Sequence, residues 1–292
     1  MAGVFVTGAT GTVGSAVVRY LQERGEAVIA GVHSPGTANR LPDGVEQRDF
    51  RFGATAEELE QSLRGADRLF LVRPPAIADV ATYLFPVIDV AQRAGMKQLV
   101  FLSLQGVQAN RRTPHHAVEA YLRSVNAPYT FLRPNFFMQN LSTTYAKDIR
   151  DHDEITVPAG RSRTAFIDAR DIGRVAAAVF TTPGHLQRAY TLSGEHSLSY
   201  ADVARTMTRV LDRPIRYTRP TERAYLASLA AEGRPADYID VQRMIYRVVR
   251  LNVSAMPNHA VRRLTGAPAT TFARFVEDHR ETWRRETGAA SA

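Results

Sequence analysis

The stretch of sequence that decides the fold is Val4-Phe5-Val6-Thr7-Gly8-Ala9-Thr10-Gly11-Thr12-Val13-Gly14. Its first three residues are apolar and predict a short buried strand, and the segment after the glycines predicts a helix that runs to about Arg24. A strand, a glycine-rich turn and a helix in this order are typical of a dinucleotide-binding unit. The spacing is Gly-x-x-Gly-x-x-Gly, which departs from the more frequent Gly-x-Gly-x-x-Gly.

Each glycine of the turn is expected to meet a different physical need. Gly8 allows the chain to turn off the strand, Gly11 allows the backbone to approach a pyrophosphate, and Gly14 allows the helix to pack close to the strand. The N-terminus of the helix offers free N–H groups and the positive end of its dipole to phosphates. We therefore assign a set of turn residues to cofactor binding, namely Gly8, Thr10, Gly11, Thr12, Val13 and Gly14.

Composition narrows the class of protein. The chain has 292 residues, 45% of them hydrophobic, and no cysteine, so disulfides and thiol chemistry are excluded. No apolar run approaches the ~20 residues of a membrane span and the first residues do not resemble a signal peptide, so we expect a cytoplasmic protein without membrane association. The net charge is +8, but the basic residues are scattered, so we expect no nucleic-acid partner. A homodimer is an open alternative.

Apolar segments alternate with amphipathic segments over the first half of the chain. Strands are expected at residues 27–32, 45–48, 69–72, 99–102 and 129–132, and helices at 57–63, 77–94 and 113–124. This alternation indicates an α/β fold with a doubly wound parallel sheet and right-handed crossovers. Later elements are expected at 136–150 (helix), 166–168 and 190–192 (strands), and from Asp171 (helix). We expect a dinucleotide-binding domain over residues 1–194 and a smaller, mainly helical substrate-side lobe over 195–292, to which 136–165 can also contribute.

The segment after the second strand bears on the choice between NAD and NADP. It reads Val32-His33-Ser34-Pro35-Gly36 and lacks the acidic residue that binds the ribose hydroxyls of NAD. Ser34 can donate to a phosphate, a protonated His33 can pair with one, and Arg40 is near enough in sequence to reach it. We therefore expect NADP (NADPH) as the cofactor, with these three side chains at its 2′-phosphate.

Two residues at the end of the third strand complete the expected adenosine site. Asp49 ends that strand, and Phe50 follows it. The Phe50 ring either covers the adenine or belongs to the core, and both interpretations stay open.

Several motifs together carry a resemblance to a known family. They are Thr7 to Gly14, Phe70 to Pro75, His116 with Glu119, Pro128 to Asn140, and Phe166 to Ile172. These resemble the NmrA-like family of atypical short-chain dehydrogenases/reductases, which includes NADPH-dependent quinone oxidoreductases and NADP-sensing regulators. The most specific run is Leu132-Arg133-Pro134-Asn135-Phe136-Phe137-Met138-Gln139-Asn140. The resemblance implies a Rossmann sheet in which one segment lies beside the nicotinamide, namely Pro134, Asn135, Phe136 and Phe137. It also implies that the cofactor cleft is lined by Val72, Arg73, Pro74 and Ser103.

The proton donor of most short-chain reductases is absent from this chain. Those enzymes use a Tyr-x-x-x-Lys pair, in which the tyrosine hydroxyl protonates the substrate oxygen. The two lysines of this chain are Lys97 and Lys147, and the residues four positions before them are Arg93 and Thr143.

Two histidines are the remaining candidates for a proton donor. If Glu119 is the glutamate that follows the lysine by four positions in extended relatives, His115 takes the lysine position and Arg111 the tyrosine position. His115 or His116 can then donate a proton or hydrogen-bond a carbonyl, with Glu119 orienting His116, or both are surface or capping histidines. Ser103, at the end of the fifth strand, either binds substrate or cofactor or makes a strand-end hydrogen bond. No metal site is expected, because adjacent histidines on a helix point about 100° apart.

Two functions remain in competition. Aromatic and apolar side chains indicate a flat, apolar or aromatic substrate, namely Phe136, Phe137, Met138, Tyr217, Tyr225, Tyr238, Tyr246 and Trp283. The first hypothesis is an NADPH-dependent oxidoreductase that transfers hydride to a quinone or another conjugated carbonyl, because the delocalised oxyanion formed there needs no tyrosine acid. The alternative is a non-catalytic, NADP-sensing redox regulator that binds a protein partner. A weaker third hypothesis is a biosynthetic reductase, dehydratase or isomerase that acts on an aromatic intermediate.

Overall fold

The computed structural model describes residues 2–33 and 41–285, and within them seven strands form one parallel sheet. The strand order is β3-β2-β1-β4-β5-β6-β9, and every neighbouring pair is parallel. The bounds are β1 Gly3–Val6, β2 Val28–Val32, β3 Glu46–Asp49, β4 Ala66–Val72, β5 Gln98–Leu102, β6 Tyr129–Pro134 and β9 Arg188–Leu192. The α/β fold with a doubly wound parallel sheet is therefore confirmed.

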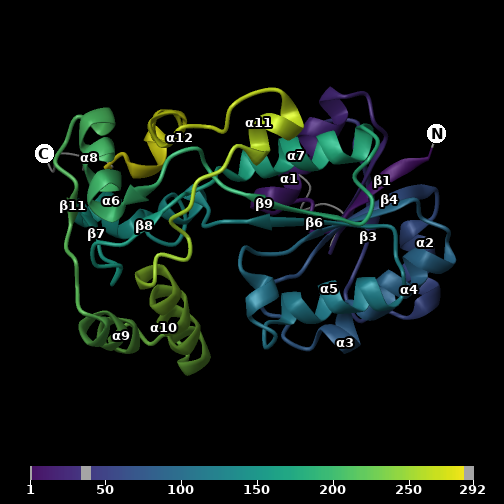
Figure 1. Cartoon of the computed structure of the whole chain (residues 1–292), viewed down its shortest axis with the longest axis horizontal. Helices are drawn as coiled ribbons and strands as arrows, with labels where there is room; N and C mark the ends of the chain where they lie inside the picture. Colours follow the sequence, from purple (N-terminus) through teal and green to yellow (C-terminus); the bar gives the residue numbers. More distant parts are fainter. Residues whose placement is uncertain (1, 34–40, 286–292) are drawn as a thin grey trace, which may run out of the picture. The chain divides into compact units, whose positions relative to one another are not determined.

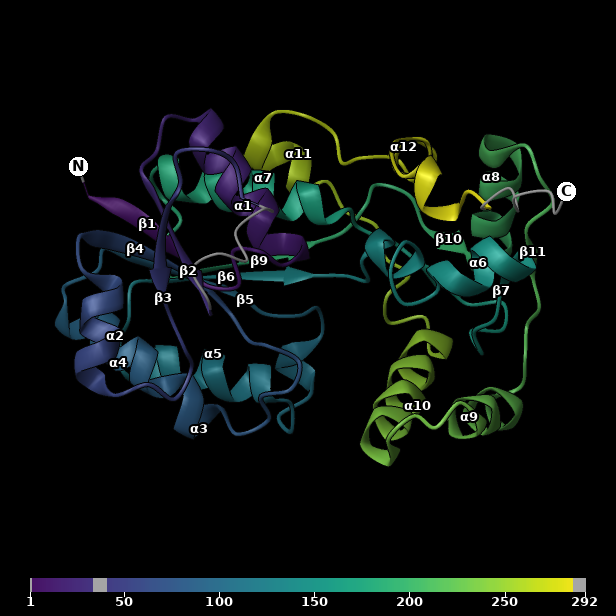
Figure 2. The ribbon, with the colours of Figure 1, turned by 180° about the vertical axis from the view of Figure 1, so that it is seen from behind.

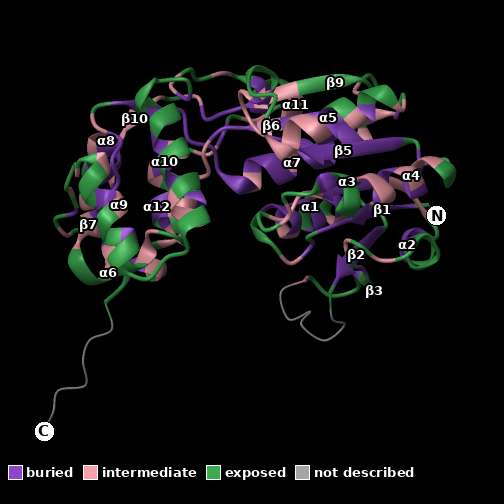
Figure 3. Ribbon diagram, turned by 90° about the horizontal axis from the view of Figure 1, so that it is seen from below, coloured by how far each residue is buried: buried purple, intermediate pink, exposed green. Residues whose placement is uncertain are grey.

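Helices cover both faces of this sheet, as Figures 1 and 2 show from opposite sides. One face carries α1 (Thr12–Glu23), α7 (Ala169–Thr181) and α11 (Ala260–Thr265), and the other carries α2 (Ala56–Leu63), α3 (Val80–Tyr83), α4 (Phe85–Arg93) and α5 (Pro114–Ser124). Central parallel strands are consequently shielded from water on both sides. All five residues of β5 are buried (Figure 3).

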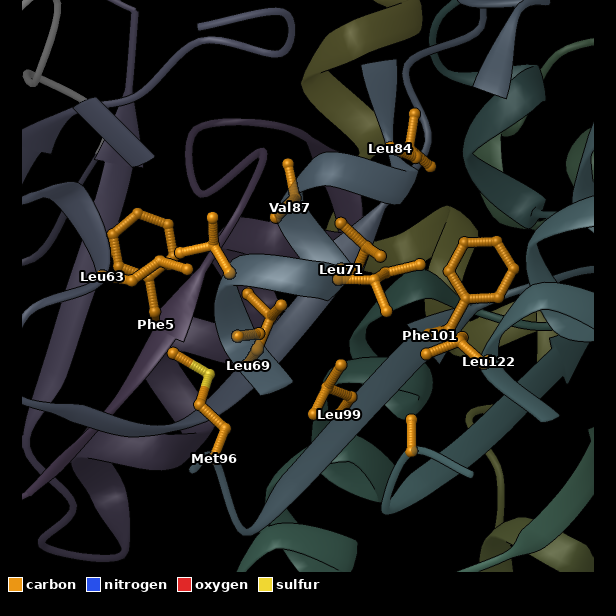
Figure 4. Packing of buried hydrophobic residues seen from close by; sticks show 14 of the residues in the cluster. Phe5, Leu63, Leu69, Leu71, Leu84, Val87, Met96, Leu99, Phe101 and Leu122 are labelled. Atoms are coloured by element: carbon orange, nitrogen blue, oxygen red, sulfur yellow. The ribbon is translucent and has the colours of Figure 1, made fainter. Parts of the chain in front are cut away.

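A hydrophobic cluster fills the space between the sheet and helices α2 to α5. Figure 4 shows its strand side chains Phe5, Leu69, Leu71, Leu99 and Phe101 meeting its helix side chains Leu63, Val87 and Leu122. Phe50 belongs to the same cluster and is only 6% exposed. Its ring centroid lies 5.4 Å from that of Phe5 and 5.0 Å from that of Phe52. Phe50 thus packs in the core, as one of its two interpretations expects.

The chain divides into two compact units, each built from separate segments. The first unit contains residues 1–134, 169–192 and 260–268, and the second contains residues 135–168, 193–259 and 269–292. The boundary expected between residues 194 and 195 differs from this division. Residues 135–168 belong to the second unit, and residues 260–268, which include α11, return to the first.

The second unit is mainly helical. Its elements are α6 Ala146–His152, α8 Tyr200–Leu211, α9 Glu222–Ala231, α10 Ala236–Arg250, α12 Phe272–Asp278, the 3₁₀ turns Met138–Leu141 and Arg280–Trp283, and two small sheets that pair β7 (Glu154–Ile155) with β11 (Arg216–Tyr217) and β8 (Arg163–Thr164) with β10 (Leu198–Ser199). Tyr225, Tyr246 and Trp283 are buried in its core. These three aromatic side chains are therefore packing residues, and the substrate surface expected of them is not what they form.

Two predicted helices are wrong in detail, each for a local physical reason. Residues 77–94 divide into α3 and α4, because Pro86 in the first turn of α4 has no N–H and cannot continue a preceding helix. The helix expected over 136–150 begins only at Ala146, because Phe137 is extended and pairs with Ile167. The strand expected at 166–168 is correspondingly reduced to this single bridge, and the helix expected from Asp171 begins at Ala169.

Gly173 generates a prediction about the packing of α7 on α1. A Cβ added at Gly173 would lie 2.6 Å from the backbone carbonyl carbon of Ala16, which is too close for any side chain. In a helix without such a neighbour, Gly→Ala stabilises by about 1 kcal/mol. Here we expect Gly173→Ala to lower the free energy of unfolding by about 1–3 kcal/mol, as overpacked cores do. Urea denaturation measures the change, and a variant at least as stable as the wild type would contradict the close approach of the two helices.

Candidate functional site

The glycine-rich turn lies at the carboxyl end of β1, where the strand order reverses between β1 and β4. Ligands of open α/β sheets bind at such a switch point. Gly8 has a φ of +60°, which favours glycine, and a Cβ added at Gly14 would lie 2.0 Å from the carbonyl oxygen of Gly8. The turn expected at Gly8 and the close helix packing expected at Gly14 are thus both present.

The N-terminus of α1 is left without a side-chain cap. Its N-cap residue is Gly11, whose own N–H donates to the Gly8 carbonyl oxygen at 2.9 Å. Thr12 is exposed, Thr10 is half-buried, and the Val13 side chain is buried beneath the turn. An uncapped helix N-terminus leaves its first N–H groups available to an anion. The residues present therefore fit the pyrophosphate of a dinucleotide.

Thr7 ties this turn to the neighbouring strand and was not predicted as a site residue. Its hydroxyl donates to the Phe70 carbonyl oxygen at 3.0 Å and accepts from the Val72 N–H at 2.9 Å. The tie holds Val72 beside Gly8, whose added Cβ would lie 3.7 Å from the Val72 Cβ. A buried hydroxyl directly after an apolar strand was the signal that could have identified it.

The loop after β4 is shaped by the guanidinium of Arg73. Its Nη1 donates to the carbonyl oxygens of Pro74, Pro75 and Ile77, and its Nε donates to Nε2 of His115 across 3.4 Å. Burial lowers the pKa of Arg73 from its ordinary value. Arg73 and Pro74 thus lie at the carboxyl edge of the sheet, the ligand edge of open α/β folds, and the guanidinium organises the loop there.

His115 is held neutral at physiological pH. Burial, together with the positive charge of Arg73, lowers the pKa of His115 to about 4. Because Arg73 donates to Nε2, that nitrogen is an acceptor and the proton of the neutral ring is on Nδ1. A neutral imidazole is a very weak acid, so the lowered pKa argues against His115 as a proton donor near neutral pH.

His116 and Ser103 are both engaged in structural contacts. The backbone N–H of His116 is capped by the Thr113 hydroxyl, and its Nδ1 lies 3.2 Å from the Val107 carbonyl oxygen. The buried Ser103 hydroxyl donates to Oε1 of Glu119 at 2.7 Å. Glu119 therefore does not orient His116 as expected, and Ser103 makes the strand-end hydrogen bond that was its alternative interpretation.

Of the polar residues expected near the adenosine of the cofactor, the structure describes His33 and Asp49. His33 is exposed directly after β2, and Asp49 ends β3, where its carboxylate accepts from Arg51 Nη2 at 3.0 Å. Ser34 and Arg40 lie outside the described residues.

The segment expected beside the nicotinamide begins in one unit and continues in the other. Pro134 ends β6 in the first unit. In the second unit, Asn135 Nδ2 donates to the Ser254 carbonyl oxygen at 2.8 Å, and Asn135 Oδ1 accepts from the Phe136 N–H at 2.8 Å. Phe136 and Phe137 are half-buried. The backbone from Asn135 to Phe137 is therefore held by hydrogen bonds of the Asn135 side chain and by the β-bridge of Phe137 to Ile167, and not by a helix.

Residues 2–33 and 41–285 contain neither a cluster of metal ligands nor a helix suited to spanning a membrane. No three His, Asp or Glu side chains come together in a group suited to a metal ion. None of the helices there has the length and apolar character needed to cross a membrane.

Comparison with known proteins places the chain among nucleotide-dependent reductases. A model of the NmrA-like family matches residues 2–249. The NAD(P)H azoreductase of Xenophilus azovorans is 34% identical over 285 residues, which cover 94% of this chain and 97% of that protein. The Citrobacter sp. triphenylmethane reductase complexed with NADP(H) has a TM-score of 0.84 at 22% identity, covering 95% and 100%. An Escherichia coli NADPH-dependent quinone oxidoreductase complexed with NADPH has a TM-score of 0.85 at 24% identity, covering 94% and 99%. These two structures share the fold of this chain.

His115 generates a prediction about pH. Its folded pKa of about 4 lies below the ordinary value of 6.5, so the unfolded chain binds more protons between these values. We expect the imidazole NMR signals of His115 to titrate near pH 4, and the titration midpoint to rise in Arg73→Met, which removes the neighbouring charge. This contribution to stability is complete above about pH 6.5 and is lost as the pH falls towards 4. A wild-type midpoint near 6.5 would contradict the burial of this ring.

Proposed function

Because the chain belongs to the NmrA-like family, we propose that it is an NADPH-dependent oxidoreductase that reduces flat, conjugated aromatic compounds, quinones among them. The observation that carries the proposal is the glycine-rich turn at the switch point of the sheet, which leads into a helix N-terminus without a side-chain cap. It occurs in a chain that is 34% identical, over nearly its whole length, to an NAD(P)H azoreductase.

The binding roles follow from the residues at the carboxyl ends of the strands and from the family resemblance. The N–H groups at the start of α1 hold the pyrophosphate, and Gly11 presents no side chain against it. His33, with Ser34 and Arg40, receives the 2′-phosphate, and no carboxylate follows β2 to favour NAD. Val72, Arg73 and Pro74 line the adjoining strand end, and the segment from Pro134 to Phe137 borders the nicotinamide.

The reaction requires no acidic side chain from the protein. NADPH, when bound, supplies the hydride. The Ser103 hydroxyl is committed to Glu119, and His115 is neutral, so neither group delivers a proton at neutral pH. An acceptor whose reduced form is a delocalised anion can accept hydride first and take its proton from water afterwards. A simple ketone gives a strongly basic alkoxide, whose formation requires an acid at the moment of hydride transfer. The chain therefore contributes mainly binding and orientation, and conjugated acceptors are the substrates that this arrangement suits.

The proposal predicts a specific pattern of activity. Purified protein should oxidise NADPH in the presence of quinones or aromatic azo compounds, and not with simple aliphatic ketones. We expect kcat to be constant between about pH 5.5 and 8, because no group with a pKa in that range takes part in the chemistry. Absorbance of NADPH at steady state measures both quantities.

Three outcomes separate the proposal from its competitors. A break in kcat near pH 6.5 would identify a histidine donor and contradict the water-derived proton. Tight NADPH binding without oxidation by any quinone, azo compound, enone or ketone would favour the non-catalytic regulator. Turnover of simple ketones at comparable rates would overturn the preference for conjugated acceptors.

A further inference from the structure

A buried carboxylate whose two oxygens each accept two hydrogen bonds joins α5 to the carboxyl ends of β5 and β6. Glu119 on α5 has a side chain that is 1% exposed. Its Oε1 accepts from the Ser103 hydroxyl at 2.7 Å and from Arg133 Nε at 2.8 Å. Its Oε2 accepts from Arg133 Nη2 at 2.5 Å and from Arg123 Nη2 at 2.9 Å. Arg133 thus grips the carboxylate with two parallel bonds, the strong and directional form of this pair.

The ionised form of this carboxylate is the stable one. Burial opposes ionisation of Glu119, but hydrogen bonds from Arg133 and Ser103 and the Arg133 charge outweigh it and lower the pKa. A buried pair that loses one partner leaves an uncompensated charge behind. The Arg133 side chain is itself only 12% exposed. Its buried charge consequently depends on Glu119 for compensation.

The partners of Glu119 lie at the carboxyl ends of two neighbouring strands. Ser103 directly follows β5, and Arg133 is the penultimate residue of β6. Backbone bonds continue the pairing there, since the Ser103 N–H donates to Leu132 O at 2.8 Å and the Gln105 N–H donates to Pro134 O at 3.0 Å. Through Ser103 and Arg133, Glu119 braces this edge from the helix side, directly before Pro134, where the chain leaves the first unit.

We infer that Glu119 is a positioning residue for the reduction, which holds the β5–β6 edge and the start of the Pro134–Phe137 segment without itself touching cofactor or substrate. This inference rests on the proposed function, which sets that segment beside the nicotinamide. Such a residue acts on the geometry of hydride transfer, in which a displacement of about 1 Å can cost on the order of 100-fold in rate.

The same unit contains a second, less buried ion pair that serves as a control. Glu26 Oε2 accepts from Arg68 Nη2 at 2.6 Å, and their side chains are 23% and 15% exposed. Glu26 lies just before β2 and Arg68 near the start of β4, so this pair is at the amino ends of the strands, opposite to the ligand edge. Loss of this pair reports the cost of a partly buried ion pair alone.

The test compares Glu119→Gln with Glu26→Gln in the full-length protein. Thermal unfolding, Kd for NADPH, kcat with a quinone, and the isotope effect with NADPH deuterated at the transferred position are measured for both. We expect both variants to melt below the wild type. Glu119→Gln alone should lose about 10-fold to 100-fold in kcat and show a changed isotope effect. Should Glu119→Gln not fold, Arg133→Lys replaces it, since lysine keeps the charge and loses the planar two-bond grip.

Each further outcome decides the inference. Unchanged kcat and isotope effect in a folded Glu119→Gln or Arg133→Lys would overturn it, as would equal kinetic losses in Glu26→Gln. If the wild type fails to oxidise NADPH with any of the acceptors tested, the proposed function fails, and this failure is separate from that of the inference. NADPH binding then decides: a Kd raised in Glu119→Gln and unchanged in Glu26→Gln would support the bracing of this edge, and equal values would overturn it.

Discussion

The close approach of α1 to the end of β1 is the constraint on which the first unit depends. At Gly14 no side chain fits, because its Cβ would overlap the Gly8 carbonyl oxygen at 2.0 Å. The Thr7 hydroxyl adds a second fixed point by bonding both to Phe70 and to Val72 on the neighbouring strand. With strand, turn and helix held in this way, the first N–H groups of α1 lie at the switch point without a side-chain cap. The exposed backbone there is what a phosphate requires.

A second constraint is electrostatic and acts along one face of α5. His115 and Glu119 are one helical turn apart, and their partners come from three strand ends: Arg73 after β4, Ser103 after β5, and Arg133 within β6. The charged and polar groups of this face bond to one another and to the loops. His115 and Glu119 thereby join the ends of three neighbouring strands to one helix face.

Much of the first unit could be predicted because its signals are local. The apolar run of β1, the glycine spacing and the alternation of later segments each lie within about a dozen residues, and the sheet followed from them. The errors arose where residues distant in the sequence determine the local conformation or the hydrogen-bond partner. Phe137 is extended because it pairs with Ile167, and the carboxylate of Glu119 bonds to Arg133, 14 positions away on a strand, as well as to Arg123 on its own helix, and not to His116. The contribution of residues 136–165 to the second unit was anticipated, whereas the return of residues 260–268 to the first unit was not, because packing and not chain order assigns them.

Titration of the purified protein with NADPH, followed by the fluorescence of the reduced nicotinamide, tests the central claim most directly. If the uncapped turn is a phosphate site at the switch point, the signal should saturate at one equivalent per chain and require much less NADPH than NADH. A signal that never saturates, or saturates equally with both nucleotides, would contradict the account.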